Sequence, residues 1–252
     1  MKIANNNSKS KTLIVAHRGA SHAALENTIA SFELAFKENA DFIEGDFRLT
    51  RDNNIVCIHD PNTRRISKDR FRLNIRSTNL SELKDLDSGF IPTLEEVLRI
   101  IPEGKGIVIE IKDNREAFVK KLVEILKLFS IPNDKIRIIA FNPNTIRRVK
   151  KYLPGIKVYW LFTWFLTKKQ YLVSFAQRRL MKILKTLDCD GIDMNAAPYI
   201  DQKLVSYLRE NNLDFCTYNV ETSEDASIVM NLGVDMITTN SPLMMRKWIA
   251  SF

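Results

Sequence analysis

Acidic side chains interrupt two short segments that are otherwise apolar. Glu44 and Asp46 lie two positions apart in FIEGDF, and Glu110 and Lys112 do so in IVIEIK, so each pair shares one face of a strand. Carboxylates brought together from neighbouring strands repel one another unless a cation or a proton lies among them. Three oxygen ligands without Cys or His suit Mg²⁺ or Ca²⁺ rather than zinc. The alternative is a buried salt-bridge network with Lys112 and Arg18.

The chain has only three histidines, and two of them end strand-like segments. His17 closes TLIVAH and His59 lies near the end of IVCIHD, whereas His22 falls in a loop and is interpreted as a bystander. Because imidazole titrates near neutral pH, two of them can act as acid and base on opposite sides of one phosphorus atom. Arg18 and Lys112 add fixed positive charge, which suits a phosphate-bearing substrate.

Short β-branched segments alternate with amphipathic helical patterns along the whole chain. The pattern predicts strands at 12–17, 42–47, 107–111, 136–140, 157–161, 191–193, 214–219 and 236–239. It predicts helices at 27–39, 93–101, 115–129, 144–152, 170–187, 201–211, 223–231 and 242–249. Eight units in 252 residues favour a closed α/β structure, a (β/α)8 TIM barrel, over an open doubly wound sheet.

The alternation is interrupted once, after the second predicted strand. An extra strand-like segment at 55–60 is followed by a polar stretch, so we expect a small insertion at about 61–90 within a single domain spanning 1–252. Active residues of such barrels lie at the carboxyl ends of the strands, and long loops there carry function. The barrel therefore predicts that the acidic pairs, His17 and His59 meet at one mouth.

Composition excludes several classes of protein. With 45% hydrophobic and 27% charged residues the chain is too apolar to be disordered. The longest aromatic and apolar stretch, 158–166, is about half of the roughly 20 residues that a membrane span needs. The basic start of the chain lacks the apolar segment of a signal peptide. Three well-separated cysteines without a CxxC pair favour a reducing compartment, so we expect a cytoplasmic protein.

The net charge of +8 comes almost entirely from one segment. Residues 157–187 contain seven basic residues and no acidic one, and aromatic residues cluster at the start of this segment. The aromatics are Tyr159, Trp160, Phe162, Trp164 and Phe165. They either cover core beneath a solvated basic face or dock peripherally on an anionic membrane. Nucleic-acid binding is not expected, because no recognised binding motif accompanies the charge.

The ordered motifs resemble those of the glycerophosphodiester phosphodiesterase family. AHRGASHAALENTIASFELAF and ADFIEGDFRLTRDNNIVCIHD are similar to the opening of that family, with its HRG, ENT, IE-x-D, LT-x-D and V-x-x-HD motifs. The similarity continues through LDSGFIPTLEEVL, IEIK, CTYNV and GVDMITTNSP, so that it spans nearly the whole chain. Each motif alone is weak evidence, but the set in this order is highly specific.

The resemblance implies a (β/α)8 barrel with one divalent cation, Mg²⁺ or Ca²⁺, that hydrolyses glycerophosphodiesters to glycerol 3-phosphate and an alcohol. It implies that the metal ligands are Glu44, Asp46 and Glu110. It implies that the catalytic histidines are His17 and His59, and that the phosphate is contacted by Arg18 and Lys112. Three positions depart from the family pattern. Leu25 replaces the usual Pro, CTYN stands for WTVN with Tyr218 as an aromatic wall for glycerol, and Asn240 replaces an Asp.

Several alternatives stay open at the level of sequence. The same site on a membrane surface would act on lysophospholipids as a phospholipase-D-type enzyme. A barrel that only binds phosphodiesters without turnover is a further alternative, although the retained histidines and carboxylates argue against it. The sequence does not distinguish water from the substrate's 2-hydroxyl as the nucleophile, or name the alcohol released. We expect a small-molecule substrate and no obligate protein partner.

Overall fold

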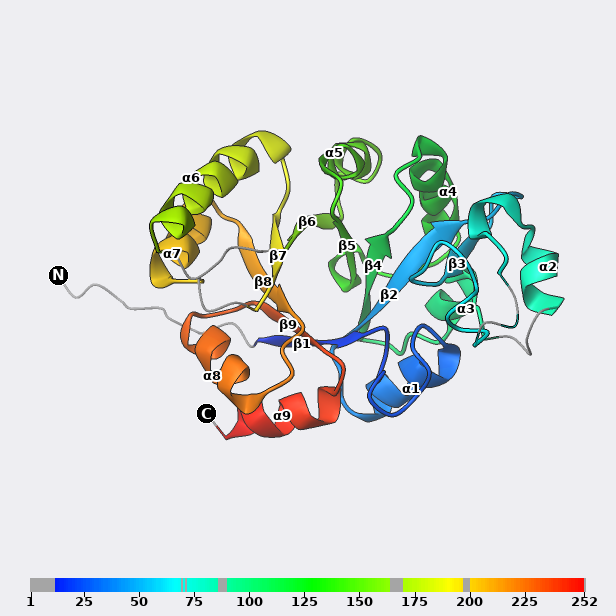
Figure 1. Cartoon of the computed structure of the whole chain (residues 1–252), viewed down its shortest axis with the longest axis horizontal. Coiled ribbons are helices and arrows are strands. Elements are labelled where there is room, and N and C mark those ends of the chain that lie inside the picture. Colours follow the sequence, from blue (N-terminus) through cyan, green and yellow to red (C-terminus); the bar gives the residue numbers. More distant parts are fainter. Residues whose placement is uncertain are drawn as a thin grey trace.

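The computed structural model describes residues 12–68, 70, 72–85, 90–163, 170–196 and 200–251, and the side chains within these ranges except those of 170–176. Eight parallel strands form its centre (Figure 1). They are β1 (Leu13–His17), β2 (Phe42–Leu49), β4 (Gly106–Ile111), β5 (Ile136–Ala140), β6 (Lys157–Phe162), β7 (Gly191–Asn195), β8 (Asp214–Tyr218) and β9 (Met236–Thr239). Since β1 pairs with both β2 and β9, the sheet closes on itself. The predicted (β/α)8 barrel is confirmed.

Helices follow the strands and surround the barrel (Figure 1). They are α1 (Ile29–Lys37), α3 (Leu94–Arg99), α4 (Glu116–Lys127), α5 (Pro143–Tyr152), α6 (Gln170–Leu187), α7 (Gln202–Glu210), α8 (Ser223–Asn231) and α9 (Pro242–Ala250). Local chemistry sets where they begin: Thr28 caps α1 and Thr93 caps α3, each in a capping box with the third helical residue. The predicted helices are all present, with ends shifted by at most two residues.

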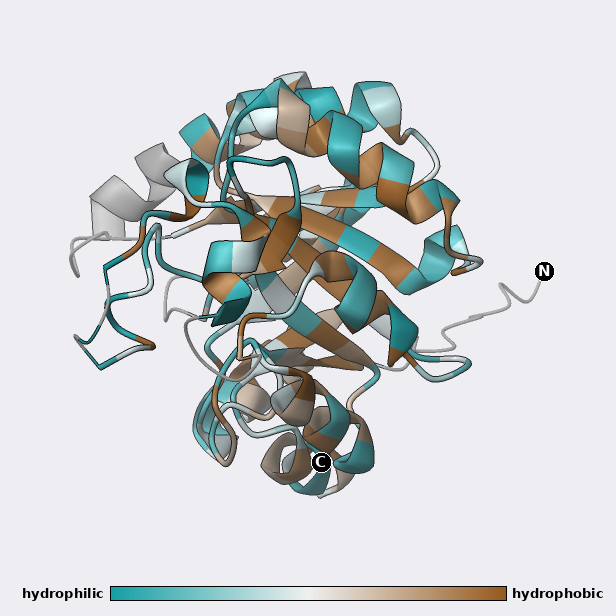
Figure 2. Cartoon of the chain, turned by 90° about the vertical axis from the view of Figure 1, so that its right-hand side faces the viewer, coloured by the Kyte–Doolittle hydropathy of each residue, from teal (hydrophilic) through white to brown (hydrophobic). Residues whose placement is uncertain are grey.

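Alternation along the strands separates two apolar regions. Outward side chains such as Ile14, Ile43 and Ile109 pack against the helices in the larger core. Inward side chains such as Val15 and Val108 fill the barrel itself. In Figure 2 the central strands are mostly brown, whereas the surrounding helices alternate brown and teal, as expected for amphipathic helices around an apolar sheet.

The insertion after β2 has its own small core. The strand β3 (Ile55–Cys57) pairs antiparallel with the end of β2, and a 3₁₀ turn η1 (Ile75–Ser77) and a short helix α2 (Leu80–Asp85) follow. Their apolar cluster consists of Val56, Ile58, Ile75, Leu83 and Ile91. The extra strand ends three residues earlier than expected, and the helix α2 was not predicted, because its six residues are too few for a helical period to show. Part of one family motif, residues 86–89, lies outside the described residues.

The basic segment 157–187 is divided by the fold. Tyr159 and Trp160 are buried, so these two aromatics cover core and are not available to a membrane. The described part of α6 exposes Arg178, Arg179, Lys182 and Lys185. Trp164, Phe165, Lys168 and Lys169 lie outside the described residues. In the part of the chain that the structure describes, no helix combines the length and apolar character needed to span a membrane.

Candidate active site

Three carboxylates converge at the carboxyl ends of β2 and β4. Glu44 and Asp46 share the inward face of β2, and Asp46 pairs in register with Glu110 of β4. All three side chains are buried, and one oxygen from each lies within 4.8 Å of one oxygen from each of the others. The strand periodicity that predicted a shared face thus brings the three predicted ligand residues into one cluster.

Two cationic side chains lie against this cluster. The Lys112 ammonium is 3.0 Å from Asp46 Oδ1 and contacts Glu110 Oε1, and Arg18 Nε is 3.0 Å from Asp46 Oδ2. The backbone N–H of Arg18, which adopts a positive φ of 55°, donates to Glu44 Oε2 at 2.9 Å. The turn after β1 therefore aims both a side chain and a backbone donor at the acidic residues.

The pKa values of the three carboxyls are driven apart. Burial opposes ionisation of Asp46, but Lys112 and Arg18 outweigh it and lower its pKa to about 2. Burial raises the pKa of Glu110 to about 7, with Lys112 opposing and Asp46 adding to the rise. Burial, then Asp46 and Glu110, raise the pKa of Glu44 well above its usual value. The two cations, Lys112 and Arg18, are too few to neutralise three ionised carboxylates.

A divalent cation fits this donor set. Among the described residues Glu44 Oε1 is buried and accepts no hydrogen bond, which leaves a hard oxygen donor free. Lys112 and Arg18 do form the ion pairs of the salt-bridge alternative, but two cations against three carboxylates leave one negative charge buried. With a bound dication the site carries one positive charge, which a phosphodiester monoanion neutralises.

Asn27 supports the cluster and was not singled out from sequence. Its Nδ2 donates to Asp46 Oδ2 at 2.8 Å, and its Oδ1 accepts from the Asp46 backbone N–H at 3.1 Å. Asn27 is buried and has a φ of 58°, a conformation that Asn tolerates better than most residues. The available signal was its place in the ENT motif, between Glu26 and Thr28.

The two predicted catalytic histidines have different partners. His17 Nδ1 lies 2.8 Å from Asn240 Oδ1, so with the amide oxygen as acceptor Nδ1 carries the proton and Nε2 is left to accept one. Burial, and then Arg18, lower the pKa of His17. His59 Nδ1 lies 2.7 Å from Asp60 Oδ1. Nδ1 of His17 is thus held by an amide oxygen and Nδ1 of His59 by a carboxylate, and both residues line the same cavity.

The third histidine does not reach this arrangement. His22 is exposed, with Nδ1 at 2.9 Å from the Asn240 carbonyl oxygen and Nε2 at 3.5 Å from Glu38 Oε1. It is not among the residues that line the cavity at the mouth. The bystander interpretation agrees with this placement.

A cavity of about 320 Å³ at the barrel mouth joins most of the predicted residues. His17, Arg18, Glu44, His59, Glu110, Lys112 and Tyr218 all line it, and Asp46 lies buried behind them. The Tyr218 hydroxyl is 2.6 Å from Thr163 Oγ1, which holds the ring on the cavity wall. The cavity is large enough for a small organic phosphate.

Asp193 is a further lining residue that the sequence analysis missed. It lies on β7 inside the barrel, and its buried Oδ1 has no hydrogen-bond partner among the described residues. Burial, and then the nearby charge of Glu110, raise its pKa to about 8, so that it holds a proton at neutral pH. The segment GIDMN gave a signal comparable to IVIEIK, an acid inside a short apolar strand.

Comparison with known proteins settles the family. The model of the glycerophosphoryl diester phosphodiesterase family matches residues 17–244. The chain belongs to this family. A glycerophosphodiester phosphodiesterase of Caldanaerobacter subterraneus subsp. tengcongensis is 31% identical over 246 residues, covering 92% of this chain and 95% of the relative. One from Bacillus subtilis is 29% identical over 266 residues, covering 95% and 87%.

Solved structures of the family share the fold. A phosphodiesterase of Oleispira antarctica, solved in complex with the product sn-glycerol-3-phosphate, matches with a TM-score of 0.80 and 25% identity, covering 94% of this chain and 96% of that one. The glycerophosphodiester phosphodiesterase of Thermotoga maritima matches with a TM-score of 0.77 at 22% identity, covering 94% and 98%. The barrel fold is thus shared with solved structures of this phosphodiesterase family.

Proposed function

We propose that this protein hydrolyses glycerophosphodiesters to glycerol 3-phosphate and an alcohol in a reaction that depends on one divalent cation. The observation that carries the proposal is the single cavity in which His17 and His59 flank a buried carboxylate cluster. The family membership supports it, as does the glycerol 3-phosphate bound as product by the Oleispira antarctica relative. Glu44, Asp46 and Glu110 are the proposed ligands of the cation, Mg²⁺ or Ca²⁺.

The two histidines divide the proton transfers. His17, whose pKa is lowered by burial and by Arg18, is neutral at pH 7 and suits the role of general base for the attacking oxygen. His59, with Asp60 accepting from Nδ1, suits the role of the acid that protonates the leaving alcohol. Water and the substrate's own 2-hydroxyl are both compatible with a base at His17, and the two routes differ in whether a cyclic phosphate forms.

Positive charge and an aromatic wall hold the substrate. Arg18 and Lys112 line the cavity beside the carboxylates, where they contact the phosphoryl oxygens. Tyr218, held by Thr163, covers the glycerol carbons. When bound, the cation supplies charge stabilisation for the phosphoryl oxygens as negative charge develops on them.

The setting of the enzyme follows from two observations. Cys57, Cys189 and Cys216 are buried free thiols, which supports a reducing, cytoplasmic location. The exposed basic residues of α6 suit peripheral contact with an anionic membrane. The lysophospholipid alternative, which requires such contact, is therefore tested alongside the main proposal.

The products decide between these substrates. Purified enzyme is incubated with glycerophosphocholine and, in parallel, with lysophosphatidylcholine, each with Mg²⁺ and with Ca²⁺. The proposal predicts glycerol 3-phosphate and choline from the first substrate. Lysophosphatidic acid from the second substrate, without glycerol 3-phosphate from the first, would transfer the assignment to a phospholipase-D-type reaction. Turnover of neither substrate would favour a narrower head-group preference or a barrel that only binds.

A further inference from the structure

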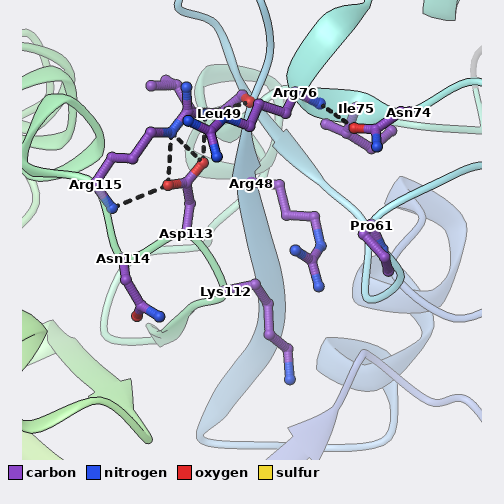
Figure 3. Close-up of a pocket in the computed structure, with 10 residues that line it drawn as sticks. All are labelled: Arg48, Leu49, Pro61, Asn74, Ile75, Arg76, Lys112, Asp113, Asn114 and Arg115. Atoms are coloured by element: carbon purple, nitrogen blue, oxygen red, sulfur yellow. Dashed lines mark hydrogen bonds and ion pairs between the residues drawn. The ribbon is translucent and has the colours of Figure 1, made fainter.

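A second cavity of about 430 Å³ lies beside the active site (Figure 3). Four segments line it: the end of β2, the loop after β3, the turn η1 of the insertion, and the loop after β4. The lining residues are Arg48 and Leu49, Pro61, Asn74 to Arg76, and Lys112 to Arg115. Figure 3 shows Arg48 and Lys112 at its centre, with Asp113 and Arg115 on one side, Asn74 and Ile75 on the other, and the Arg76 side chain reaching from η1 towards Asp113.

Positive charge dominates this lining, with four cationic side chains against the single carboxylate of Asp113. That carboxylate is already satisfied, because Arg115 Nε lies 2.9 and 3.0 Å from its two oxygens. Lys112 is engaged by the carboxylate cluster. Arg48 and Arg76 form no direct ion pair with a carboxylate in the described part of the chain, and nearby carboxylates, Asp113 among them, act on them only at longer range.

Arg48 links the second cavity to the catalytic one. Its Nε and Nη2 donate to the His59 carbonyl oxygen at 2.9 and 2.6 Å, a neutral acceptor that leaves the guanidinium charge in place. Lys112 lines both cavities, and Pro61 follows the His59–Asp60 pair directly. The basic cavity therefore adjoins the catalytic cavity at Lys112 and along the segment from His59 to Pro61.

Resting on the proposed function, we propose that the basic cavity binds a second phosphate group carried by the alcohol part of the substrate. A guanidinium pair is the side-chain chemistry best matched to phosphate oxygens. His59, the proposed donor to the leaving alcohol, is the residue whose backbone carbonyl accepts from Arg48, so it lies next to the basic cavity. The preferred substrates are glycerophosphodiesters with a phosphorylated alcohol, and those with a cationic alcohol such as choline are disfavoured by charge repulsion.

The test compares substrates that differ only by this phosphate. Release of glycerol 3-phosphate is measured with glycerophosphoinositol and with glycerophosphoinositol 4-phosphate, at low and at high salt. The wild-type kcat/KM is expected to be about tenfold higher for the 4-phosphate at low ionic strength. The preference should shrink at high salt, because the Debye length falls to about 3 Å at 1 M.

Arg76→Gln is the decisive variant, since Arg76 is exposed and its side chain has no role in holding His59. It should reduce the preference for the 4-phosphate to about twofold or less. Arg72→Gln is the matched control: it removes the same charge from the same insertion, at an exposed residue that lines neither cavity, and should keep the full preference.

Each other result has a defined meaning. Equal kcat/KM for both substrates in the wild type, or a preference that survives Arg76→Gln, would overturn the subsite while leaving the proposed function intact. An unchanged preference combined with Arg76-dependent inhibition by inorganic phosphate would assign the cavity to a free anion and also overturn the proposal. If neither substrate yields glycerol 3-phosphate, the proposed function itself is overturned, and the subsite with it.

Discussion

At the scale of single residues, the site is defined by what holds each reactive group. Asn27 fixes Asp46 through two hydrogen bonds, and the backbone of Arg18 fixes Glu44. The sequence was sufficient to select the inward carboxylates of β2 and β4, since strand periodicity places each pair of polar residues on one face. Asn27 could not be selected in the same way, because its importance depends on a left-handed backbone conformation and on a contact 19 residues away.

Removal of either histidine should abolish most of the activity. His17→Ala and His59→Ala are expected to lower kcat by at least about 100-fold, the lower end for positioned acid–base groups. His22→Ala, which removes an exposed ring outside the cavity, should keep near wild-type kcat. Steady-state kinetics with circular dichroism as a check on folding measure this, and near-normal kcat in either of the first two variants would refute its role.

The partner of His17 sets the acid limb of the pH profile. Because burial and Arg18 lower the pKa of His17, the limb of kcat/KM in the wild type should lie below about pH 6.5. Asn240→Asp places a carboxylate against Nδ1, which stabilises the imidazolium and should move this limb upward by about one pH unit. Asn211→Asp, an exposed change of equal charge at the end of α7, is the control. A limb that does not move would refute His17 as the base.

At the scale of elements, the order of strands and helices of the barrel was predictable. For the insertion, the sequence indicated its position in the chain but not its internal structure. Buried strands and amphipathic helices each repeat with their own period, so their existence shows in the sequence. The insertion lacks such a period: α2 has six residues, and its core depends on contacts of Ile75 and Leu83 with Val56. The basic cavity between η1 and the loop after β4 also depends on segments that are distant in the sequence, so no residue spacing indicates it.

Close packing of β7 against β8 requires a glycine. A Cβ on Gly191 would lie 2.4 Å from the backbone oxygen of Asp214, an atom that cannot turn aside. Gly191→Ala should therefore cost about 1–3 kcal/mol of unfolding free energy. Gly155→Ala meets only the side-chain amide of Asn133, at 2.8 Å, and should cost clearly less. Urea denaturation compares the two, and equal costs would contradict the account of strand packing.

At the scale of the whole molecule, buried acids make stability depend on pH. Asp193 has a folded pKa of about 8, above its unfolded value of about 3.9, so the folded protein keeps a proton that the unfolded chain releases. Stability is therefore lost as pH rises from about 4 to about 8. GIDMN indicates an acid within a buried strand, but the proximity of Asp193 to Glu110 depends on closure of the sheet.

Asp193→Asn keeps a neutral group of similar shape and removes this titration. Its Tm should match that of the wild type near pH 4.5 and exceed it at pH 8. A gain of 1 kcal/mol corresponds to about 2–4 °C in a protein of this size. Differential scanning fluorimetry across this range makes the comparison. A difference in Tm that is the same at both pH values would show that Asp193 is ionised throughout.

The central claim joins the carboxylate cluster to turnover, and one measurement tests it directly. Enzyme stripped with EDTA is assayed for glycerol 3-phosphate release from glycerophosphoglycerol, before and after addition of Mg²⁺ or Ca²⁺, with Glu110→Gln alongside. The account predicts no release in EDTA, restoration by one or both cations, and an apparent cation affinity weakened in the variant. Full activity of the stripped enzyme in EDTA would contradict it.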